Sequence, residues 1–474
     1  MPPLDRRRRL LILTVCCMSL LIVSLDNTVM NVALPSIRRD FGASVTGLQW
    51  AIDAYTLVLA ALLMPSGALA DRIGLAIFTT ASLLCSLAPG LGWLTGFRAL
   101  QAIGGSMLNP VAMAIITNTF TDPRERGRAI GIWGGVVGIS MAAGPLVGGV
   151  LVEWTGWRSI FWINVPIGLA AIVLATRLVP ESKAERARRT DFVGQALMAV
   201  LLAATAYGII ESPHHGLVSP VVLGAAAVAL LCLAGLLWYE PRRAEPFIDL
   251  RFFRSPPFTG ATAIAVAAFA ALGGFLFVNT LYLQDVRGLG PLGAGLYMLP
   301  MAAVTLVCSP LSGRMVGGVG PRPPLLIAGV CLIASGTGLA LAVAAQMPVW
   351  ALAGGFVAFG VGFSMVNAPI TDAAVSGMPR EQAGVAGAIA STSRQIGTSI
   401  GVAVIGSVVA AGRLGTPGFA GAQRAAYWII AGCGVVVLVL GAATTGRRAR
   451  AAAERNAELL ELENTEHVRA TVAS

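Results

Sequence analysis

Long apolar runs, separated by short polar gaps, follow one another along almost the whole chain. A bilayer needs roughly 20 apolar residues for each helical crossing, and the backbone polar groups inside it must be satisfied within the helix. The 474 residues are 56% hydrophobic and only 12% charged, whereas soluble domains carry about 25% charged residues. The sequence therefore predicts an all-α polytopic membrane protein without a separate soluble domain.

The apolar runs number fourteen when they are counted between charged residues and Pro or Gly punctuation. The first run follows four arginines as a signal peptide would, but it is too long and lacks a small-residue cleavage site, so we assign it as a helix. The expected spans are 10–32, 48–69, 75–94, 96–118, 129–151, 158–178, 192–210, 217–239, 258–283, 291–312, 323–345, 349–371, 383–410 and 423–445.

The arginines separate when alternate gaps are assigned to opposite sides of the membrane. One side collects most of them, including residues 6–9 and the tail after residue 447, and the other side holds few. By the positive-inside rule, the N- and C-termini are both cytoplasmic. This spread accounts for the net charge of +10 without a nucleic-acid partner. The use of arginine in place of lysine, with much alanine and glycine, suggests the cytoplasmic membrane of a bacterium.

An internal repeat divides the chain. Pro123-Arg124-Glu125 recurs as Pro379-Arg380-Glu381, an offset of 256 residues, and Gly144 recurs as Gly401, an offset of 257. Many transporters consist of two such halves around a central path. We therefore predict two six-helix repeats plus two inserted helices. The expected divisions are a first bundle at 1–180, an inserted pair with cytoplasmic linkers at 181–256, a second bundle at 257–446 and a cytoplasmic tail at 447–474.

The charged residues that qualify as lying within the membrane are Asp26, Asp53, Arg98 and Arg394. A charge within the bilayer is costly unless it faces a cavity or a partner, so each is a candidate functional residue. The rise of a helix places the first three at similar depth. A carboxylate in an apolar cavity near an arginine can be tuned to take up and release protons. If a cationic substrate competes for that carboxylate, opposing fluxes are coupled.

Structural alternatives exist for each of these charges. Asp26 or Asp53 can instead form a salt bridge with Arg98 that only fixes helix packing. For Arg394 the alternatives are contact with substrate, tuning of a proton site, and a buried ion pair. The short segment with Glu211, His214 and His215 is expected to be a solvated outer loop after the seventh run.

Glycines are concentrated in the fifth apolar run, where they surround a proline. Small residues allow close backbone approach between membrane helices, and a proline removes a helical hydrogen bond and bends the helix. This pattern fits either tight packing or a hinge. The residues concerned are Gly138, Gly144, Pro145, Gly148 and Gly149.

Nothing in the sequence indicates an enzyme. The seven cysteines lie in or beside apolar runs without a CxxC pair, so we expect neither a disulfide framework nor a metal site. No HExxH motif occurs, and the chance matches to GxSxG at Gly397–Gly401 and to GxGxxG at Gly288–Gly293 lack the strand-to-helix setting that such motifs require. We expect no cofactor.

Several motifs together resemble those of the major facilitator superfamily, and within it the fourteen-helix drug:proton antiporters. The resemblance covers nearly the whole chain. The matching stretches are Leu25-Asp26-Asn27-Thr28 to Pro35, the pattern of Trp50, Asp53 and Tyr55, the Gly67 to Gly74 segment, Arg98-Ala99-Leu100-Gln101, Gly144 to Gly149, Trp157-Arg158, Asn164 to Gly168, and Ser393 to Gly397.

The resemblance implies roles for individual residues. The helix 2 acid, here Asp53, recognises cationic drugs in some members, and the helix 4 arginine, here Arg98, is linked to proton transfer. The Gly144 to Gly149 stretch resembles the motif that marks antiporters. A gating motif in the loop between helices 2 and 3 corresponds to Gly67, Asp71, Arg72 and Gly74.

One departure from the family pattern concerns this loop. Gly74 runs directly into Leu75-Ala76-Ile77, without the basic cluster usual there. The Gly67–Gly74 segment echoes Gly313–Gly320 at an offset of only 246, which is 10 less than the offset of 256 found further along. The shortfall therefore lies near helix 3, and we predict weakened gating on the cytoplasmic side.

The combined expectation is proton-coupled export (antiport) of small amphipathic compounds such as drugs, antibiotics or an endogenous secondary metabolite. The implied partners are a small amphipathic or cationic substrate, protons and the lipid bilayer, and the implied unit is a monomer driven by the proton gradient. An importer or facilitator of another small solute is the alternative.

Overall fold

A computed structural model describes residues 5–62, 68–120, 122–178, 191–243, 249–344, 347–375, 383–412, 417–446, 449 and 451–456. Within these residues the regular secondary structure is entirely helical, as predicted. The helices before the inserted pair are α1 (Arg6–Phe41), α2 (Val45–Ala61), α3 (Ala68–Ser86), α4 (Leu91–Thr119), α5 (Pro123–Thr155), α6 (Ser159–Trp162) and α7 (Asn164–Leu178). The pair itself is α8 (Phe192–His215) and α9 (Pro220–Tyr239), followed by short 3₁₀ turns at Glu240–Arg242 and Leu250–Arg254.

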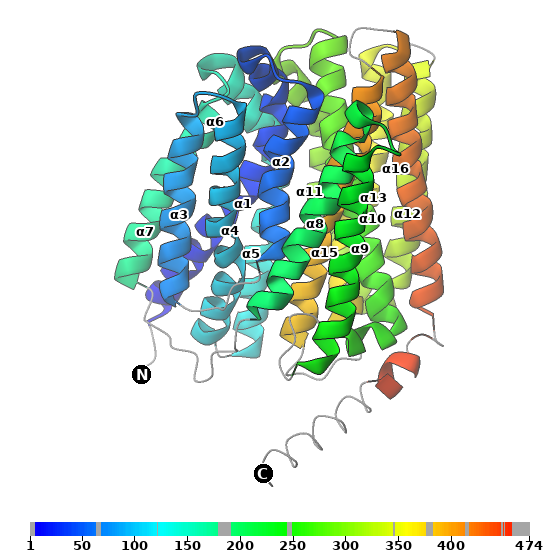
Figure 1. Cartoon of the computed structure of the whole chain (residues 1–474). Coiled ribbons are helices and arrows are strands. Elements are labelled where there is room, and N and C mark those ends of the chain that lie inside the picture. The colour runs from blue at the N-terminus through cyan, green and yellow to red at the C-terminus, as the bar shows by residue number, and fades with distance from the viewer. Residues whose placement is uncertain are drawn as a thin grey trace.

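The remaining helices continue the same up-and-down order. They are α10 (Pro256–Leu281) with a π-helical turn at Tyr282–Val286, α11 (Pro291–Val319), α12 (Arg322–Ala344), a 3₁₀ turn at Val349–Leu352, α13 (Ala353–Ser364), α14 (Asn367–Val375), α15 (Ala383–Ala411) and α16 (Pro417–Thr444). The helices run side by side along one direction, and both the start of α1 and the end of α16 lie at the lower end of the molecule (Figure 1).

Local signals set the ends of several helices. Gly42 follows α1 with φ of 60°, a left-handed conformation that glycine adopts without strain, and it turns the chain toward α2. The Ser44 side chain then caps α2 by accepting a hydrogen bond from the Gly47 amide at 3.1 Å. Ser219 caps α9 in the same way, with Pro220 at the first helical position. These caps fix the tight connections at the upper end.

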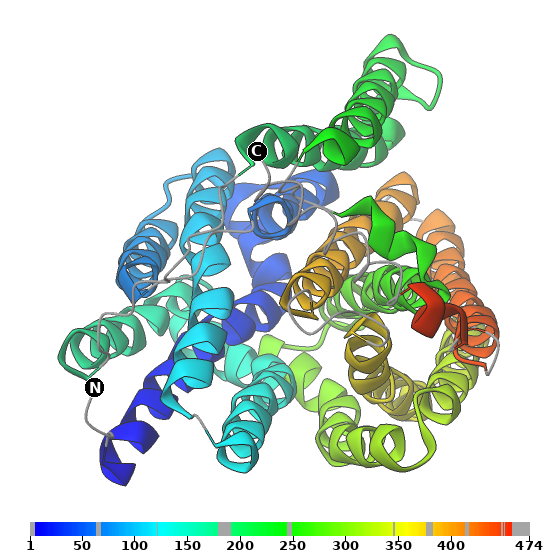
Figure 2. The same cartoon turned by 90° about the horizontal axis from the view of Figure 1, so that it is seen from below.

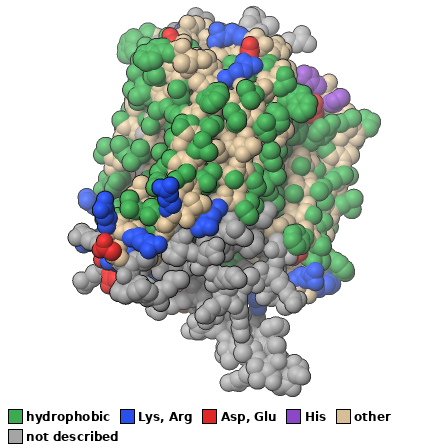
Figure 3. Space-filling view, turned by 90° about the vertical axis from the view of Figure 1, so that its left-hand side faces the viewer, with side chains coloured by type: hydrophobic (Ala, Val, Ile, Leu, Met, Phe, Trp, Pro, Cys, Tyr) green, Lys and Arg blue, Asp and Glu red, His purple; other side chains and the backbone are tan. Residues whose placement is uncertain are grey.

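Eleven helical segments among the described residues are long and apolar enough to cross a membrane, and Val45–Ala61 and Arg72–Ser86 are apolar but shorter. One face of the molecule shows hydrophobic side chains across its middle, with arginines near its two ends (Figure 3). Large apolar side chains such as Leu231 of α9, 71% exposed, project outward. The chain is therefore a multi-pass membrane protein, while the count of fourteen crossings stays a prediction.

The helices form two groups with a pair at their side. Seen from below, α1 to α7 gather on one side and α10 to α16 on the other, while α8 and α9 project from the outside (Figure 2). Helix α8 packs against α2 of the first group and α15 of the second. A small hydrophobic cluster that includes Leu57, Leu202 and Ala403 joins these three helices.

Contacts between the two groups are concentrated at the upper end. The Arg38 and Asp285 side chains form an ion pair at 3.2 Å, and the Gln284 amide donates to the Val32 carbonyl at 2.9 Å. The backbone N–H of Leu292 donates to the Glu153 carboxylate at 3.0 Å. These three bridges connect the two groups of helices at the upper end.

Three sequence expectations about element bounds need correction. Helix 3 was expected at 75–94, but α3 covers Ala68–Ser86, so Arg72 lies within a helix and not in a loop. Helix 12 was expected to be continuous, yet α13 and α14 are separated at Met365 and Val366. The expected outer loop at residues 211–215 is the last turn of α8. Packing against neighbouring helices extends regular structure over these polar residues.

Candidate functional site

Asp26 lies at the centre of a buried polar network. Its carboxylate forms an ion pair and hydrogen bond with the Arg98 guanidinium, and it also accepts hydrogen bonds from the Gln101 and Asn164 amides, each at 2.9 Å. Asp26 is 3% exposed and the three partners are 0% exposed. A buried carboxylate needs such charged and polar donors to offset the loss of its hydration.

Arg98 has several partners besides Asp26. Its Nη1 donates to the Gln101 side-chain oxygen Oε1 at 2.7 Å, and its Nε lies 3.4 Å from the Ala51 backbone carbonyl oxygen. The guanidinium also stands over the Tyr55 ring, 4.1 Å from its centroid. A cation over an aromatic face is stabilised by the ring quadrupole. Only Arg98 Nη2 makes no hydrogen bond.

We call this site the Asp26 network, and five helices contribute to it. Its residues are Asp26 of α1, Tyr55 of α2, Ser82 of α3, Arg98 and Gln101 of α4, and Asn164 of α7. The Gln101 side-chain amide connects α3 to the network by donating a hydrogen bond to Ser82 Oγ at 2.8 Å. Sequence reasoning placed Asp26 and Arg98 at one depth, and the structure brings them into contact. It assigned no role to Gln101 or Asn164. Gln101 follows Arg98 by three residues, so it shares a helix face with it.

Asp53 does not join this network, so the alternative in which it pairs with Arg98 is wrong. Its Oδ1 lies 3.3 Å from the Thr56 hydroxyl, one turn along α2. Ser399 of α15 lies beside the same carboxylate, although Oδ2 of Asp53 and the Ser399 hydroxyl lack a well-aligned hydrogen bond. Asp53 is 0% exposed. It is therefore a buried acid at the boundary between the two helix groups, next to hydroxyl groups.

Gln49 marks the same boundary one turn above Asp53. Its amide donates to the Val402 carbonyl at 3.2 Å and to the Ala403 carbonyl at 2.9 Å. A Cβ on Gly406 would lie 2.5 Å from the Gln49 side chain, so only a glycine leaves room for it. We call this line of contacts between α2 and α15 the seam, defined by Gln49, Asp53, Ser399, Val402, Ala403 and Gly406.

Arg394 lies in α15, in the second group of helices, and does not belong to the Asp26 network. Its Nη2 donates to the Thr371 hydroxyl of α14 at 2.7 Å, and its guanidinium stands 6.0 Å from the centroid of the Phe269 ring of α10. It forms no ion pair with any described carboxylate. The alternative of a buried ion pair is thus not realised within the described chain.

The expected gating motif is only partly visible. Gly67 lies outside the described residues, and Asp71 is described by its helical backbone alone. Gly74 packs tightly against α4, because a Cβ there would lie 3.0 Å from both the Gly104 carbonyl and the Met107 Cβ. Gly74 therefore serves the α3–α4 contact. Whether the missing basic cluster weakens gating stays a prediction.

The glycines of α5 approach two different helices. A Cβ on Gly144 would lie 2.0 Å from the Thr28 hydroxyl of α1, and one on Gly148 would lie 3.1 Å from Val29. A Cβ on Gly149 would lie 2.8 Å from the Leu292 backbone of α11. The predicted close approach is confirmed at these positions. Gly138 is described by its backbone only, and Pro145 lies inside an uninterrupted helix.

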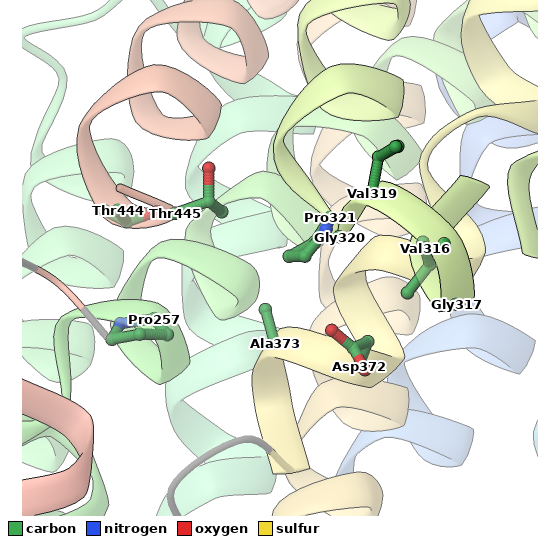
Figure 4. Close-up of a pocket in the computed structure, with 11 residues that line it drawn as sticks. Pro257, Val316, Gly317, Val319, Gly320, Pro321, Asp372, Ala373, Thr444 and Thr445 are labelled. Atoms are coloured by element: carbon green, nitrogen blue, oxygen red, sulfur yellow. The ribbon is translucent and has the colours of Figure 1, made fainter. Parts of the chain in front are cut away.

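Two open pockets lie at the ends of the molecule, away from the Asp26 network. One of about 680 Å³ at the upper end includes Arg39, Asp40 and Arg158. The other, of about 420 Å³, is lined by parts of α10, α11, α14 and α16 together with Gly320, Pro321 and Thr445, and the close-up shows Asp372 on one of its walls (Figure 4). Neither contains a predicted proton-coupling residue.

Comparison with known families and curated proteins relates this geometry to transport. The family model described as the Major Facilitator Superfamily matches residues 16–402. "Multidrug resistance protein Stp" of Mycobacterium tuberculosis is 38% identical over 85% of this chain and 76% of its own length. "Tetracenomycin C resistance and export protein" of Streptomyces glaucescens is 37% identical over 83% of this chain and 74% of its own length. The "Methylenomycin A resistance protein" of Bacillus subtilis is 31% identical over 91% of each chain.

Solved structures share the fold at low sequence identity. A bacterial homologue of the human lysosomal transporter Spinster, in its inward-facing and occupied conformation, superposes with a TM-score of 0.62 and 18% identity, covering 94% of this chain and 99% of that one. A peptide transporter in complex with sulfate gives a TM-score of 0.63 and 15% identity, covering 94% and 95% of the two chains.

Proposed function

The chain belongs to the major facilitator superfamily, and on that premise we propose that it exports small amphipathic compounds, such as drugs, antibiotics or an endogenous secondary metabolite, in exchange for protons. The observation that carries this proposal is the Asp26 network, an acid and an arginine held inside a chain that is similar to named resistance and export proteins. The proton gradient is the only energy source required, so no cofactor takes part.

Asp26 is the proposed carrier of the coupled proton, and Arg98 the group that controls it. Protonation of Asp26 removes the negative charge that compensates Arg98, whose remaining hydrogen-bond partners are the Gln101 oxygen and the Ala51 carbonyl. Because Asp26, Arg98 and Asn164 lie on three different helices, loss of that charge loosens the attachment of α1 to α4 and α7. Proton uptake is thereby linked to movement of helices.

Asp53 is the second proposed proton site. An ionised carboxylate is costly at a fully buried position without a neighbouring cation. Among the described residues, the polar neighbours of Asp53 are the hydroxyls of Thr56 and Ser399. Asp53 is therefore neutral while the seam is closed. Opening of the seam admits water, which allows the proton to leave and a cationic substrate to take its place.

The proposed orientation places the lower end in the cytoplasm of a bacterium. It follows from the positive-inside rule, because the arginines of the first turns of α1 lie at that end. In this arrangement the chain crosses the cytoplasmic membrane fourteen times as a monomer, with two six-helix bundles at 1–180 and 257–446 beside an inserted pair at 181–256. The bridges at the upper end, such as Arg38 to Asp285, then belong to an inward-facing state.

Efflux measurements in cells test this proposal. A strain that lacks its own pumps is loaded with a panel of dyes and antibiotics, and efflux is followed with and without a protonophore. We expect export of at least one amphipathic probe, lost when the gradient collapses. Export that continues without the gradient contradicts proton coupling, and accumulation inside the cell by the same chain indicates the importer alternative.

A further inference from the structure

Arg394 carries a positive charge that the described protein does not neutralise. The guanidinium has one hydrogen bond, to the neutral hydroxyl of Thr371, and Nε makes none. Helices α15 and α10 are in close contact here, because a Cβ on Gly397 would lie 2.4 Å from the Val266 carbonyl and one on Gly401 would lie 2.1 Å from the Ala270 carbonyl. Such contact leaves the α15 backbone little freedom to carry the charge elsewhere.

Charges in membrane helices normally pair with another group or face water. Arg98 shows the paired arrangement in the same molecule, with a carboxylate, an amide oxygen and an aromatic ring around it. Arg394 has no negative partner among the described residues, and the residue as a whole is only partly buried. Among the described residues nothing neutralises its charge, so it is open to an anionic group from outside them.

The surroundings of Arg394 indicate what kind of group fits. Phe269 lies beside the guanidinium and meets Phe363 edge to face, with ring centroids 5.1 Å apart. Thr371 adds a hydroxyl that accepts a hydrogen bond from Nη2 of the guanidinium. A planar guanidinium binds a carboxylate through two parallel hydrogen bonds, and it binds the single oxygen of a phenolate through charge-assisted hydrogen bonds. The neighbouring ring supplies apolar area for an aromatic skeleton.

We propose that Arg394, with Thr371 and Phe269, is a subsite for an ionised acid group, a carboxylate or a phenolate, carried on an aromatic substrate. This rests on the proposed export function and adds a substrate class to the cationic compounds expected from the sequence. The acid group binds the Nη atoms of Arg394 while its ring packs against Phe269. Transport of such compounds therefore depends on the charge at position 394 more strongly than transport of cations does.

Two xanthene dyes with the same ring system test this subsite. Inside-out vesicles containing the full chain are energised, and uptake of fluorescein, an anion, is compared with uptake of rhodamine 6G, a cation whose carboxyl group is esterified. In Arg394→Gln we expect fluorescein uptake to fall at least about tenfold more than rhodamine uptake, since a charged hydrogen bond is lost. Arg394→Lys keeps the charge and should recover part of the fluorescein uptake. Arg424→Gln, at an exposed position in α16, is the matched control and should not change the ratio.

Each outcome separates the subsite from the export function. If the wild type transports rhodamine 6G but not fluorescein, or if Arg394→Gln lowers both dyes equally, the subsite is wrong and export stands. If neither dye nor any other probe is transported, the export function itself fails. A further experiment replaces chloride by isethionate, to test whether Arg394 binds a chloride ion and not the acid group of the substrate. If the wild type needs chloride to take up both dyes and Arg394→Gln does not, Arg394 is a chloride site and the proposal is overturned.

Discussion

Arg98 of α4 and Arg394 of α15 are both arginines within membrane helices, but they differ in what surrounds them. Arg98 meets a carboxylate, an amide oxygen, a backbone carbonyl and a tyrosine ring, and it is 0% exposed. Arg394 meets one threonine hydroxyl and the edge of an aromatic cluster, and it is partly exposed. The first group of helices thus holds a closed charge pair, and the second holds a cation with spare hydrogen-bonding capacity.

This difference suggests that the two groups of helices serve different functions in transport. A closed pair responds to a proton, because protonation of Asp26 changes the charge balance among fixed partners. An open cation responds to a ligand, because a ligand can supply the missing charge. We therefore expect proton coupling to depend on the first group and substrate selection to depend more on the second.

The largest change in stability is expected when one partner of the Asp26–Arg98 pair is removed. Arg98→Gln leaves Asp26 buried without its cation, and removal of one partner of a buried pair costs about 3–5 kcal/mol. The double variant Asp26→Asn with Arg98→Gln removes both charges and should recover most of that loss. Unfolding of the purified variants in detergent measures the difference. A double variant no more stable than Arg98→Gln contradicts the view that the two charges compensate each other.

A smaller loss is expected from crowding the helix that carries Asp26. Gly144→Ala places a Cβ 2.0 Å from the Thr28 hydroxyl, two residues beyond Asp26 in α1, and overpacking of this kind costs about 1–3 kcal/mol. Gly387→Ala in α15 is the control, because no atom lies within 4 Å of its Cβ position. Thermal unfolding and dye efflux should both decline for Gly144→Ala alone. Equal effects of the two substitutions argue against close packing of α5 on α1.

The opposite sign is expected for the open cation. Arg394→Gln removes a charge that the described chain does not compensate, so the free energy of unfolding should rise by about 1–2 kcal/mol in the absence of substrate. The same unfolding assay applies, with the exposed Arg424→Gln as a control for the loss of a surface charge. A clear loss of stability in Arg394→Gln shows that the protein does neutralise this arginine.

The seam should give the smallest change in stability. Gln49→Leu removes two hydrogen bonds to the Val402 and Ala403 carbonyls, worth about 1 kcal/mol in a membrane interior. Because the seam joins the two groups of helices, its loss should favour separation of their upper ends. Distances between spin labels on Thr155 and Arg424 report that separation. An unchanged distance distribution contradicts a role for the seam in closing the upper end.

The sequence predicted the depth of the Asp26 network better than its membership. Asp26 and Arg98 could be placed at one level because the helical rise is fixed and the apolar runs mark where each helix enters the membrane. Which acid meets Arg98 depends on the rotation of each helix about its axis, and the sequence left Asp26 and Asp53 equivalent. Asn164 comes from a distant helix, so no spacing rule connects it to Asp26.

The predicted helix bounds were wrong at some polar residues, because the sequence does not show how helices pack against one another. Asp71 and Arg72 suggested a loop, but the glycines at positions 74 and 104 allow α3 and α4 to pack closely, and the helix begins before those charges. Tertiary packing outweighs local preference there. Glu211 was assigned to a loop in the same way, yet it accepts a hydrogen bond from the Trp50 indole and belongs to α8.

Proton-coupled export through Asp26 is tested by reconstituting the wild type and Asp26→Asn into liposomes with a pH-sensitive dye inside and a transported substrate on one side. For the wild type, a substrate gradient should drive proton movement in the opposite direction. For Asp26→Asn, substrate should still bind, while substrate-driven proton movement falls to the level of empty liposomes. Proton movement in Asp26→Asn equal to that of the wild type contradicts the account, because the Asp26 network would then be only structural.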